Sequence, residues 1–457
     1  MDTSDIDPFN HSADKSPYFE PCPEKKGPTA NVKPEEEKCP QQDALEELSR
    51  QRTDPNNYPE GGLQAWLVVF GSFCGTTACF GLTNSIGVVH TYVANNILTD
   101  YSDGQIGWIF SVYLFITMAG GVLGGPIFDL YGPRWMICIG GILLTLGIMM
   151  TSLATAYWQF LMAFGILTGI GTSLVFTSSF AAPGHWFLRR RGLATGIAAT
   201  GGSVGGVIVP LMMQSLIPKI GFEWALRSLG FLIFGLSVVA NILVRSRLPP
   251  LPNSNVFPDF YIFKQIPFTL LTIAVMTMEL ALFVPITYIS SYAVDMGLGT
   301  ALSYQLVAIL NAGSFFGRIL AGFAADMMGR FNTLAFCVFL CMVSCVAFWL
   351  PAGSNTAIVI MFAISFGFAS GSNVSLIPVC VGQLCRTEEY GRYYATLYTV
   401  VSIGPLVGVP IGGTILQSSN GHYWSLIIFT AIVYGCSVAL IMVARGIARG
   451  WSLKIVF

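Results

Sequence analysis

Charged side chains are scarce in this sequence. Only 10% of the 457 residues are Asp, Glu, Lys or Arg, whereas soluble globular domains carry about 25%. Hydrophobic residues make up 53% of the chain, and the mean hydropathy is +0.65. A chain with so few charges lacks the surface of a soluble globular protein, so the composition predicts a membrane protein.

Residues that bind metals or carry catalysis are also few or scattered. The four histidines (His11, His90, His185 and His422) lie far apart in the sequence, and most of the 11 cysteines lie inside apolar segments. A metal site needs several imidazoles or thiolates that converge, and apolar packing explains the cysteines better. No nucleophile with a neighbouring base and no cofactor motif is found, so we expect no enzyme, no metal and no cofactor.

What the sequence does contain is a series of long apolar runs. A helix crosses a hydrocarbon core about 30 Å thick in about 20 residues and satisfies its own backbone hydrogen bonds. Twelve segments meet this requirement: 65–90, 104–128, 136–155, 158–180, 193–217, 224–244, 266–293, 303–325, 332–350, 356–378, 392–416 and 424–446. We therefore predict an all-α polytopic membrane protein with twelve transmembrane helices.

The positions of Lys and Arg predict the orientation. Seven of these 23 residues precede the first span, and thirteen lie in loops or the tail on the same side, whereas Lys219 alone falls in a loop on the other side. Arg227 and Arg318 lie inside spans. Since cytoplasmic loops carry the excess of Lys and Arg, both termini are predicted to be cytoplasmic.

The first 62 residues differ from the rest of the chain. They contain 14 acidic and 7 basic residues and almost no apolar clusters. Such a segment cannot bury enough surface to offset its ordering entropy, so we predict a disordered cytoplasmic tail over 1–62. The loops account for the basic excess of the remaining chain, and no nucleic-acid partner is expected.

One motif occurs twice. GGPIFDLYGPR contains Gly125, Asp129 and Gly132, and AGFAADMMGR repeats that spacing 197 residues later with Gly322, Asp326 and Gly329. Each copy lies at the end of the second span of a six-span half. The predicted organisation is thus a first half over 63–244, a cytoplasmic linker over 245–264, a second half over 265–446 and a short cytoplasmic tail over 447–457.

The repeated motif predicts a gate. Its first glycine permits close helix approach, its aspartate can accept hydrogen bonds from backbone N–H groups or a loop arginine, and its second glycine allows a tight turn before a basic residue. The alternative is an ordinary helix end, but two copies in register favour a latch that closes in one state and opens in another. The candidate gating residues are Asp129, Arg134, Asp326 and Arg330.

The twelve spans and both motif copies resemble the major facilitator superfamily over residues 61–450. Within it, GGLQAWLVVFGSF (61–73), RRRGLATGIAATGGSVGG (189–206), FVPITYISSYA (283–293) and FFGRILAGFAAD (315–326) are similar to the monocarboxylate porter family, especially its fungal members. The resemblance implies a transporter with a central site that opens alternately to each face. Such porters usually move a monocarboxylate with a proton.

The resemblance also implies individual site residues. The family's intramembrane arginine, which meets the substrate carboxylate, falls on Arg318. The animal lactate carriers have an aspartate where this chain has Ser314, and a lysine where it has Asn84. Two of three charges are therefore missing, which argues against simple cotransport of lactate and a proton.

An additional charge lies inside the seventh span. Glu279 precedes Pro285 in VMTMELALFVP, and a charged side chain at the bilayer centre costs about 2.5 kcal/mol or more. We therefore expect Glu279 to face the cavity and hypothesise that it carries the proton. The alternatives are a neutral, hydrogen-bonded structural acid or a partner of Arg318.

Helix periodicity suggests the other cavity residues. Asn311 and Ser314 precede Arg318 at spacings that place all three on one helix stripe. The first spans of the two halves contribute Phe80, Asn84 and Tyr288. Amides and aromatic rings around one cation suit a fairly large, partly apolar anion or polar metabolite.

Two classes of function remain. The first is a secondary transporter that exports a fungal specialised metabolite or, alternatively, takes up a monocarboxylate or vitamin-like solute. The second is a membrane sensor on a transporter scaffold, which the short tail argues against. We expect a small-molecule substrate, a proton and the lipid bilayer as partners and a monomer as the working unit. The expected location is the plasma membrane, with a vacuolar or vesicular membrane as the alternative.

Overall fold

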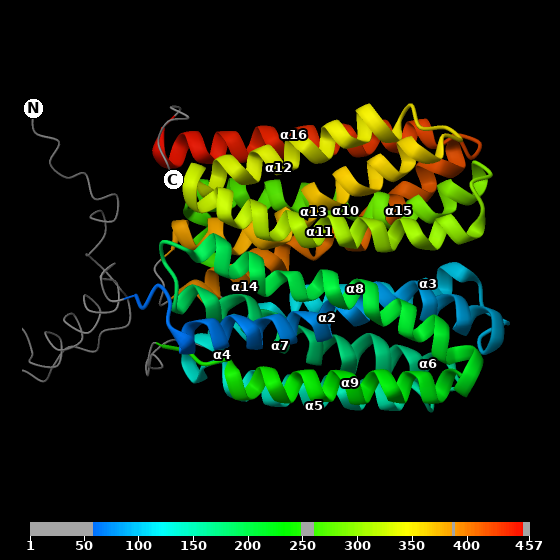
Figure 1. Ribbon diagram of the computed structural model, residues 1–457, viewed down its shortest axis with the longest axis horizontal. Helices are drawn as coiled ribbons and strands as arrows, with labels where there is room; N and C mark the ends of the chain where they lie inside the picture. The colour runs from blue at the N-terminus through cyan, green and yellow to red at the C-terminus, as the bar shows by residue number, and fades with distance from the viewer. Residues whose placement is uncertain (1–57, 248–259, 386–388, 451–457) are drawn as a thin grey trace, which may run out of the picture. The chain divides into compact units, whose positions relative to one another are not determined.

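The computed structural model describes residues 58–247, 260–385 and 389–450, and every regular element in these ranges is a helix (Figure 1). Within them, 12 helices are long and apolar enough to cross a membrane. The prediction of an all-α chain with twelve spans is confirmed. The structure does not describe residues 1–57, 248–259, 386–388 and 451–457. Most of the predicted N-terminal tail, the middle of the predicted linker and most of the predicted C-terminal tail therefore lie outside the described residues.

The first half contains six spans, two of which are built from more than one helix. Gly120 separates two helices of the second span, and a π-helix over Leu161–Thr168 interrupts the fourth. The helices are α2 (Leu63–Asn96), α3 (Asp103–Ala119), α4 (Gly121–Tyr131), α5 (Pro133–Thr151), α6 (Tyr157–Phe160), α7 (Gly169–Ala181), α8 (Arg191–Ile220) and α9 (Phe222–Leu243).

The second half follows a 3₁₀-helix over Phe260–Lys264 and repeats the six-span order. Here the ninth span contains a π-helix over Cys345–Trp349, and the eleventh span is divided at Ser402. The helices are α10 (Ile266–Asp295), α11 (Thr300–Met328), α12 (Arg330–Ser344), α13 (Thr356–Leu384), α14 (Tyr390–Val401), α15 (Ile403–Ser418) and α16 (Tyr423–Arg449).

Successive spans alternate in direction, so each half begins and ends at the same end of the bundle. We call this the tail end; it is the end at which α2 begins and α16 ends (Figure 1). Gly132 and Gly329, the second glycines of the repeated motif, lie there with φ of 76° and 94°. Because L-residues with side chains rarely adopt such φ values, glycine allows the sharp turns from α4 to α5 and from α11 to α12.

Two pairs of helices form the principal seams between the halves. The α8 helix packs along α11, and α4 packs along α14. In Figure 1, α5 and α9 lie at one edge of the bundle and α12 and α16 at the opposite edge, with α8 and α11 between them. Side chains on α8 and α11 can therefore contact both halves at once.

Candidate functional site

Arg318 lies on α11 at the seam with α8, with 6% of its surface exposed. Its Nε donates to Ser314 Oγ at 3.2 Å, and its Nη1 donates to the carbonyl of Ala199 on α8. Ser314 Oγ also accepts a hydrogen bond from Ser203 of α8 at 3.1 Å. All these acceptors are neutral, and in the described part of the chain no carboxylate pairs with Arg318.

Glycines of α8 bring the other predicted cavity residues to Arg318. A Cβ atom on Gly202 would lie 2.8 Å from the Phe80 ring, and the Arg318 guanidinium carbon lies 5.5 Å from the centre of that ring. One turn along, a Cβ on Gly206 would lie 2.7 Å from Asn311 Oδ1 and 3.0 Å from Asn84 Nδ2. The structure thus places Phe80, Asn84, Asn311, Ser314 and Arg318 together against one face of α8.

The two amides in this group are held along their own helices. Asn84 Nδ2 donates to the carbonyl of Phe80 at 2.8 Å, and Asn311 Nδ2 donates to the carbonyl of Val307 at 3.1 Å. These bonds occupy an N–H of each amide and leave the carbonyl oxygens as acceptors. The group therefore offers one cation and two amide oxygens, which suits an anion that also carries hydroxyl or N–H donors.

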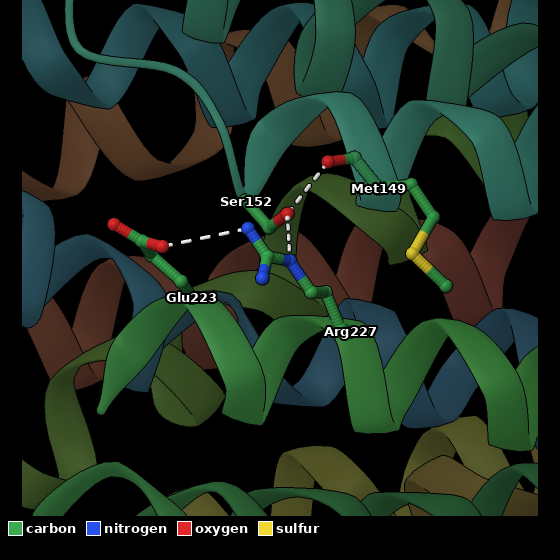
Figure 2. A network of polar contacts seen from close by, with 4 residues as sticks. All are labelled: Met149, Ser152, Glu223 and Arg227. Atoms are coloured by element: carbon green, nitrogen blue, oxygen red, sulfur yellow. Dashed lines mark hydrogen bonds and ion pairs between the residues drawn. The ribbon is translucent and has the colours of Figure 1, made fainter. Parts of the chain in front are cut away.

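Arg227 on α9 has a different environment (Figure 2). Its Nη2 lies 3.4 Å from Glu223 Oε2, and its Nε donates to Ser152 Oγ at 3.2 Å. Ser152 Oγ in turn donates to the carbonyl of Met149 at 2.7 Å. Arg227 thus joins α9 to the end of α5 far from the tail end, and its charge is already paired.

Glu279 lies on α10 and is 2% exposed. Among the described residues it forms no hydrogen bond or ion pair, so it is not bonded to Arg318 there. A Cβ atom on Gly404 of α15 would lie 3.4 Å from the Cβ of Glu279, so Glu279 lies where α10 packs against α15. The structure therefore places Glu279 against the start of α15 and gives it no bond to Arg318.

Tyr288 lies further along α10 and is half-buried. Its hydroxyl lies 3.0 Å from where a Cβ on Gly413 of α15 would be, and its ring lies 3.1 Å from the corresponding position on Gly412. These contacts place Tyr288 against α15.

An aromatic cluster that the sequence did not predict joins the halves. Phe80 contacts Phe176 of α7 with ring centres 5.8 Å apart, and Phe176 contacts Tyr398 of α14 at 5.6 Å. Phe180 and Tyr394 form a second pair across the halves at 6.4 Å. The cluster thus connects the ring beside Arg318 to tyrosines of α14 in the other half. The four-residue spacing of Tyr390, Tyr394 and Tyr398 was the available signal.

Asp326 ends the eighth span at the tail end and caps a helix of the other half. Its two carboxylate oxygens accept hydrogen bonds from the backbone N–H groups of Gly192 at 2.8 Å and Leu193 at 2.9 Å. These N–H groups belong to the first turn of α8, where the helix dipole also favours a negative charge. Arg330 Nη2 donates to the carbonyl of Leu188 at 2.5 Å. We call this set of contacts the α11 latch.

Asp129 occupies the equivalent position in the first half. It is 9% exposed, and its Oδ2 accepts a hydrogen bond from the backbone N–H of Arg392, in the first turn of α14, at 3.0 Å. Arg134, by contrast, is exposed and forms no hydrogen bond or ion pair within the described residues. We call the contact between Asp129 and α14 the α4 latch.

The sequence did not predict the role of Arg191. Its position indicates only one more basic residue in a loop at the membrane surface. Arg191 is 1% exposed and donates to the carbonyl of Gly184 at 2.8 Å within its own half. It also donates to the carbonyl of Gly382, at the end of α13 in the other half, at 3.1 Å. Arg191 therefore adds a third tie between the halves at the tail end.

Comparison with known sequences gives consistent matches. A family model described as Major Facilitator Superfamily matches residues 65–408. "MFS-type transporter 1" of an Ophiocordyceps species is 41% identical over 401 residues, which cover 88% of this chain and 89% of the relative.

Two other relatives carry more specific names. The "Fujikurins efflux protein" of Gibberella fujikuroi is 39% identical and covers 85% of this chain and 83% of its own. The "Riboflavin transporter MCH5" of Saccharomyces cerevisiae is 35% identical, with coverage of 87% and 81%. Among solved structures, the human organic anion transporter MFSD10 matches with a TM-score of 0.67 at 12% identity, over 83% of this chain and 100% of that chain.

Proposed function

The chain belongs to the major facilitator superfamily and is a multi-pass membrane transporter, and from that premise we propose that it exports a small organic acid or related fungal specialised metabolite. Arg318 is the anchor for the anionic or polar group of the substrate. The proposal assigns the chain to the monocarboxylate porters within the superfamily, with the substrate held between the halves.

The observation that carries this proposal is the unpaired charge of Arg318. A buried ion without a counter-ion is costly, and an intramembrane arginine normally faces a partner or a water-filled cavity. Within the described residues, the hydrogen-bond partners of the guanidinium are a carbonyl and a hydroxyl, both neutral. A substrate anion at the α8–α11 seam would supply the missing negative charge from a position that both halves can reach.

The gate in this proposal consists of the latches at the tail end. Asp129, Asp326 and Arg330 join the halves there, and their bonds must break if that end is to open. The excess of Lys and Arg supports a cytoplasmic tail end. On that orientation, the structure represents the state that is closed to the cytoplasm, and transport proceeds as the halves rock about the central site.

Export is favoured over uptake because the chain is 39% identical to a protein named for efflux of fujikurins. Ser314 and Asn84, which replace the charges of lactate carriers, also favour a substrate larger than a three-carbon acid. Uptake of a vitamin-like solute is the second candidate, supported by 35% identity to a riboflavin transporter. The plasma membrane is the proposed location for either direction.

Deletion and complementation of the gene test the anchor. Without the transporter, we expect an acidic metabolite to accumulate inside the cells and to fall in the medium, as measured by mass spectrometry. Arg318→Ala is expected to reach the membrane yet restore less than about a hundredth of export, since removing a partner of a buried charged contact costs about 3–5 kcal/mol.

Arg227→Ala is the matched control, because it removes an arginine that is paired within the first half. It should restore most of the export. Normal export by Arg318→Ala would contradict the anchor assignment, and a deletion strain that fails to take up a nutrient would favour the alternative direction.

Proton coupling through Glu279 is a separate part of the proposal. With the metabolite identified above, transport into proteoliposomes should respond to an imposed pH gradient in the wild-type protein but not in Glu279→Gln. Retained pH dependence in Glu279→Gln would show that another group carries the proton or that none is carried.

A further inference from the structure

Glu60 lies just before the first membrane span and binds a loop that no span contains. Its Oε1 accepts hydrogen bonds from the backbone N–H groups of Leu188 at 2.8 Å and Arg189 at 2.6 Å, and its Oε2 accepts one from Arg190 at 3.2 Å. One carboxylate thus holds three consecutive backbone N–H groups, immediately before α8 begins at Arg191. Such charge-assisted bonds are stronger than bonds between neutral groups.

The same loop makes the bonds of the α11 latch. The carbonyl of Leu188 accepts from Arg330, while the N–H of Leu188 donates to Glu60. The peptide N–H groups of Gly192 and Leu193, only a few residues on, donate to Asp326. Glu60 therefore fixes the loop from within the first half. From the second half, Arg330 binds the loop and Asp326 binds the first turn of α8, which follows the loop.

The segment that carries Glu60 is itself anchored. Tyr58 is 6% exposed, and the Arg247 guanidinium carbon lies 4.6 Å from the centre of its ring. Arg247 Nε donates to the carbonyl of His185 at 2.9 Å, at the beginning of the loop. The residues just before the first span and just after the sixth are thus both fastened to the loop that precedes α8.

The backbone of Glu60 supports a specific role for its side chain. Glu60 has a φ of 49°, which is uncommon for a residue with a side chain. Such conformations persist where surrounding contacts hold them, and they cluster at functional positions. Here the three hydrogen bonds of the carboxylate are the contacts that hold it.

We propose that Glu60 is a positioning residue for the transport cycle. By holding residues 188–190, it presents the N-terminus of α8 to Asp326 and the Leu188 carbonyl to Arg330. Glu60 thereby favours the state closed at the tail end. This inference rests on the proposed function, because it assigns Glu60 to the gate of that transporter. It also makes the segment just before α2 a point at which the gate can be controlled.

Distances between spin labels on the two halves test the proposal. Labels are placed on Ile242→Cys at the end of α9 and Ile447→Cys near the end of α16, both exposed positions at the tail end and away from the latches. Cys22, Cys39, Cys138 and Cys436 are replaced by serine so that only the two new thiols react. The full-length protein is measured in lipid nanodiscs, so no substrate is required.

In Glu60→Gln, which keeps the size of the side chain, the ratio of short to long distances is expected to fall about tenfold. Glu60→Ala should lower it further. The matched control, Glu223→Gln, removes a carboxylate that pairs with Arg227 far from the tail end, and it should leave the ratio unchanged.

A double-mutant cycle identifies the route of the effect. If Glu60 acts through the loop, Glu60→Gln should have a clearly smaller effect in an Arg330→Ala background than in the wild type. An unchanged distance ratio in a folded Glu60→Gln protein, or full additivity with Arg330→Ala, would overturn the proposal. Failure of the proposed function is distinguishable, because it would appear as normal export by Arg318→Ala and would leave these distances unaffected.

Discussion

The α4 latch and the α11 latch come from copies of one sequence motif, yet their contacts are unequal. Asp129 accepts one hydrogen bond from the start of α14, whereas Asp326 accepts two from the start of α8. Arg330 is bonded to the opposite half, whereas Arg134 is exposed. Both copies of the motif thus cap the start of a helix in the opposite half, but they do so with different hydrogen bonds.

The two latches share a close helix approach. A Cβ on Gly125 would collide with the carbonyl of Gly391 on α14, and a Cβ on Gly322 would collide with the carbonyl of Gly192 on α8. Glycine is needed at both places because backbone atoms of the two halves nearly touch there. The difference between the latches therefore lies in their polar bonds and not in how closely the helices pack.

The largest expected effects come from the shared glycines. Gly125→Ala and Gly322→Ala should each reduce the population closed at the tail end by about five- to a hundredfold, since overpacking costs about 1–3 kcal/mol. The spin-label distances described above are the measurement. Gly235→Ala on α9 is the control, because a Cβ there meets nothing within 4 Å. Markedly unequal effects at Gly125 and Gly322 would contradict equal packing in the two latches.

The aspartates should have smaller and unequal effects. Asp326→Asn is expected to lower the closed population about tenfold and Asp129→Asn about fivefold. Replacing a hydrogen bond to a charged group by one to a neutral group loses about 1 kcal/mol, and Asp326 accepts one more such bond than Asp129. The same labels report the result. Equal effects at the two positions would remove the asymmetry that we infer from the hydrogen bonds.

The arginines should give the smallest effects and the sharpest contrast. Arg330→Ala should lower the closed population about threefold, because it removes a hydrogen bond to Leu188 across the halves. Arg134→Ala should change it by less than about twofold, as expected for an exposed side chain. An effect of Arg134→Ala as large as that of Arg330→Ala would mean that Arg134 has a partner in another state of the cycle.

The residues around Arg318 show how far the sequence could predict the site. Arg318, Ser314 and Asn311 share one helix, so periodicity placed them on one stripe, and the structure brings Phe80 and Asn84 to them. Periodicity could not place Glu279 relative to Arg318, because the two lie on different helices. Tyr288 was predicted to line the cavity, and it contacts Gly412 and Gly413 of α15. The cavity role of these side chains and the proton role of Glu279 remain predictions.

The sequence by itself determined the features that depend on local order along the chain. Each apolar run must form a helix in lipid, so the twelve spans could be counted, and two copies of one motif indicated two halves of a superfamily transporter. Cytoplasmic termini, a monomer and the plasma membrane remain predictions from the same pattern.

Only the tertiary structure decided which groups meet. Asp326 binds an N–H of α8 that lies 134 residues away in the sequence, and Asp129 binds one of α14 that lies 263 residues away. Glu60 and the N–H of Arg189 that it binds are 129 residues apart. Hydrogen bonds depend on distances of about 3 Å between atoms, and such distances follow from how whole helices pack. Helical periodicity shows which face a side chain occupies but not which neighbour that face will meet.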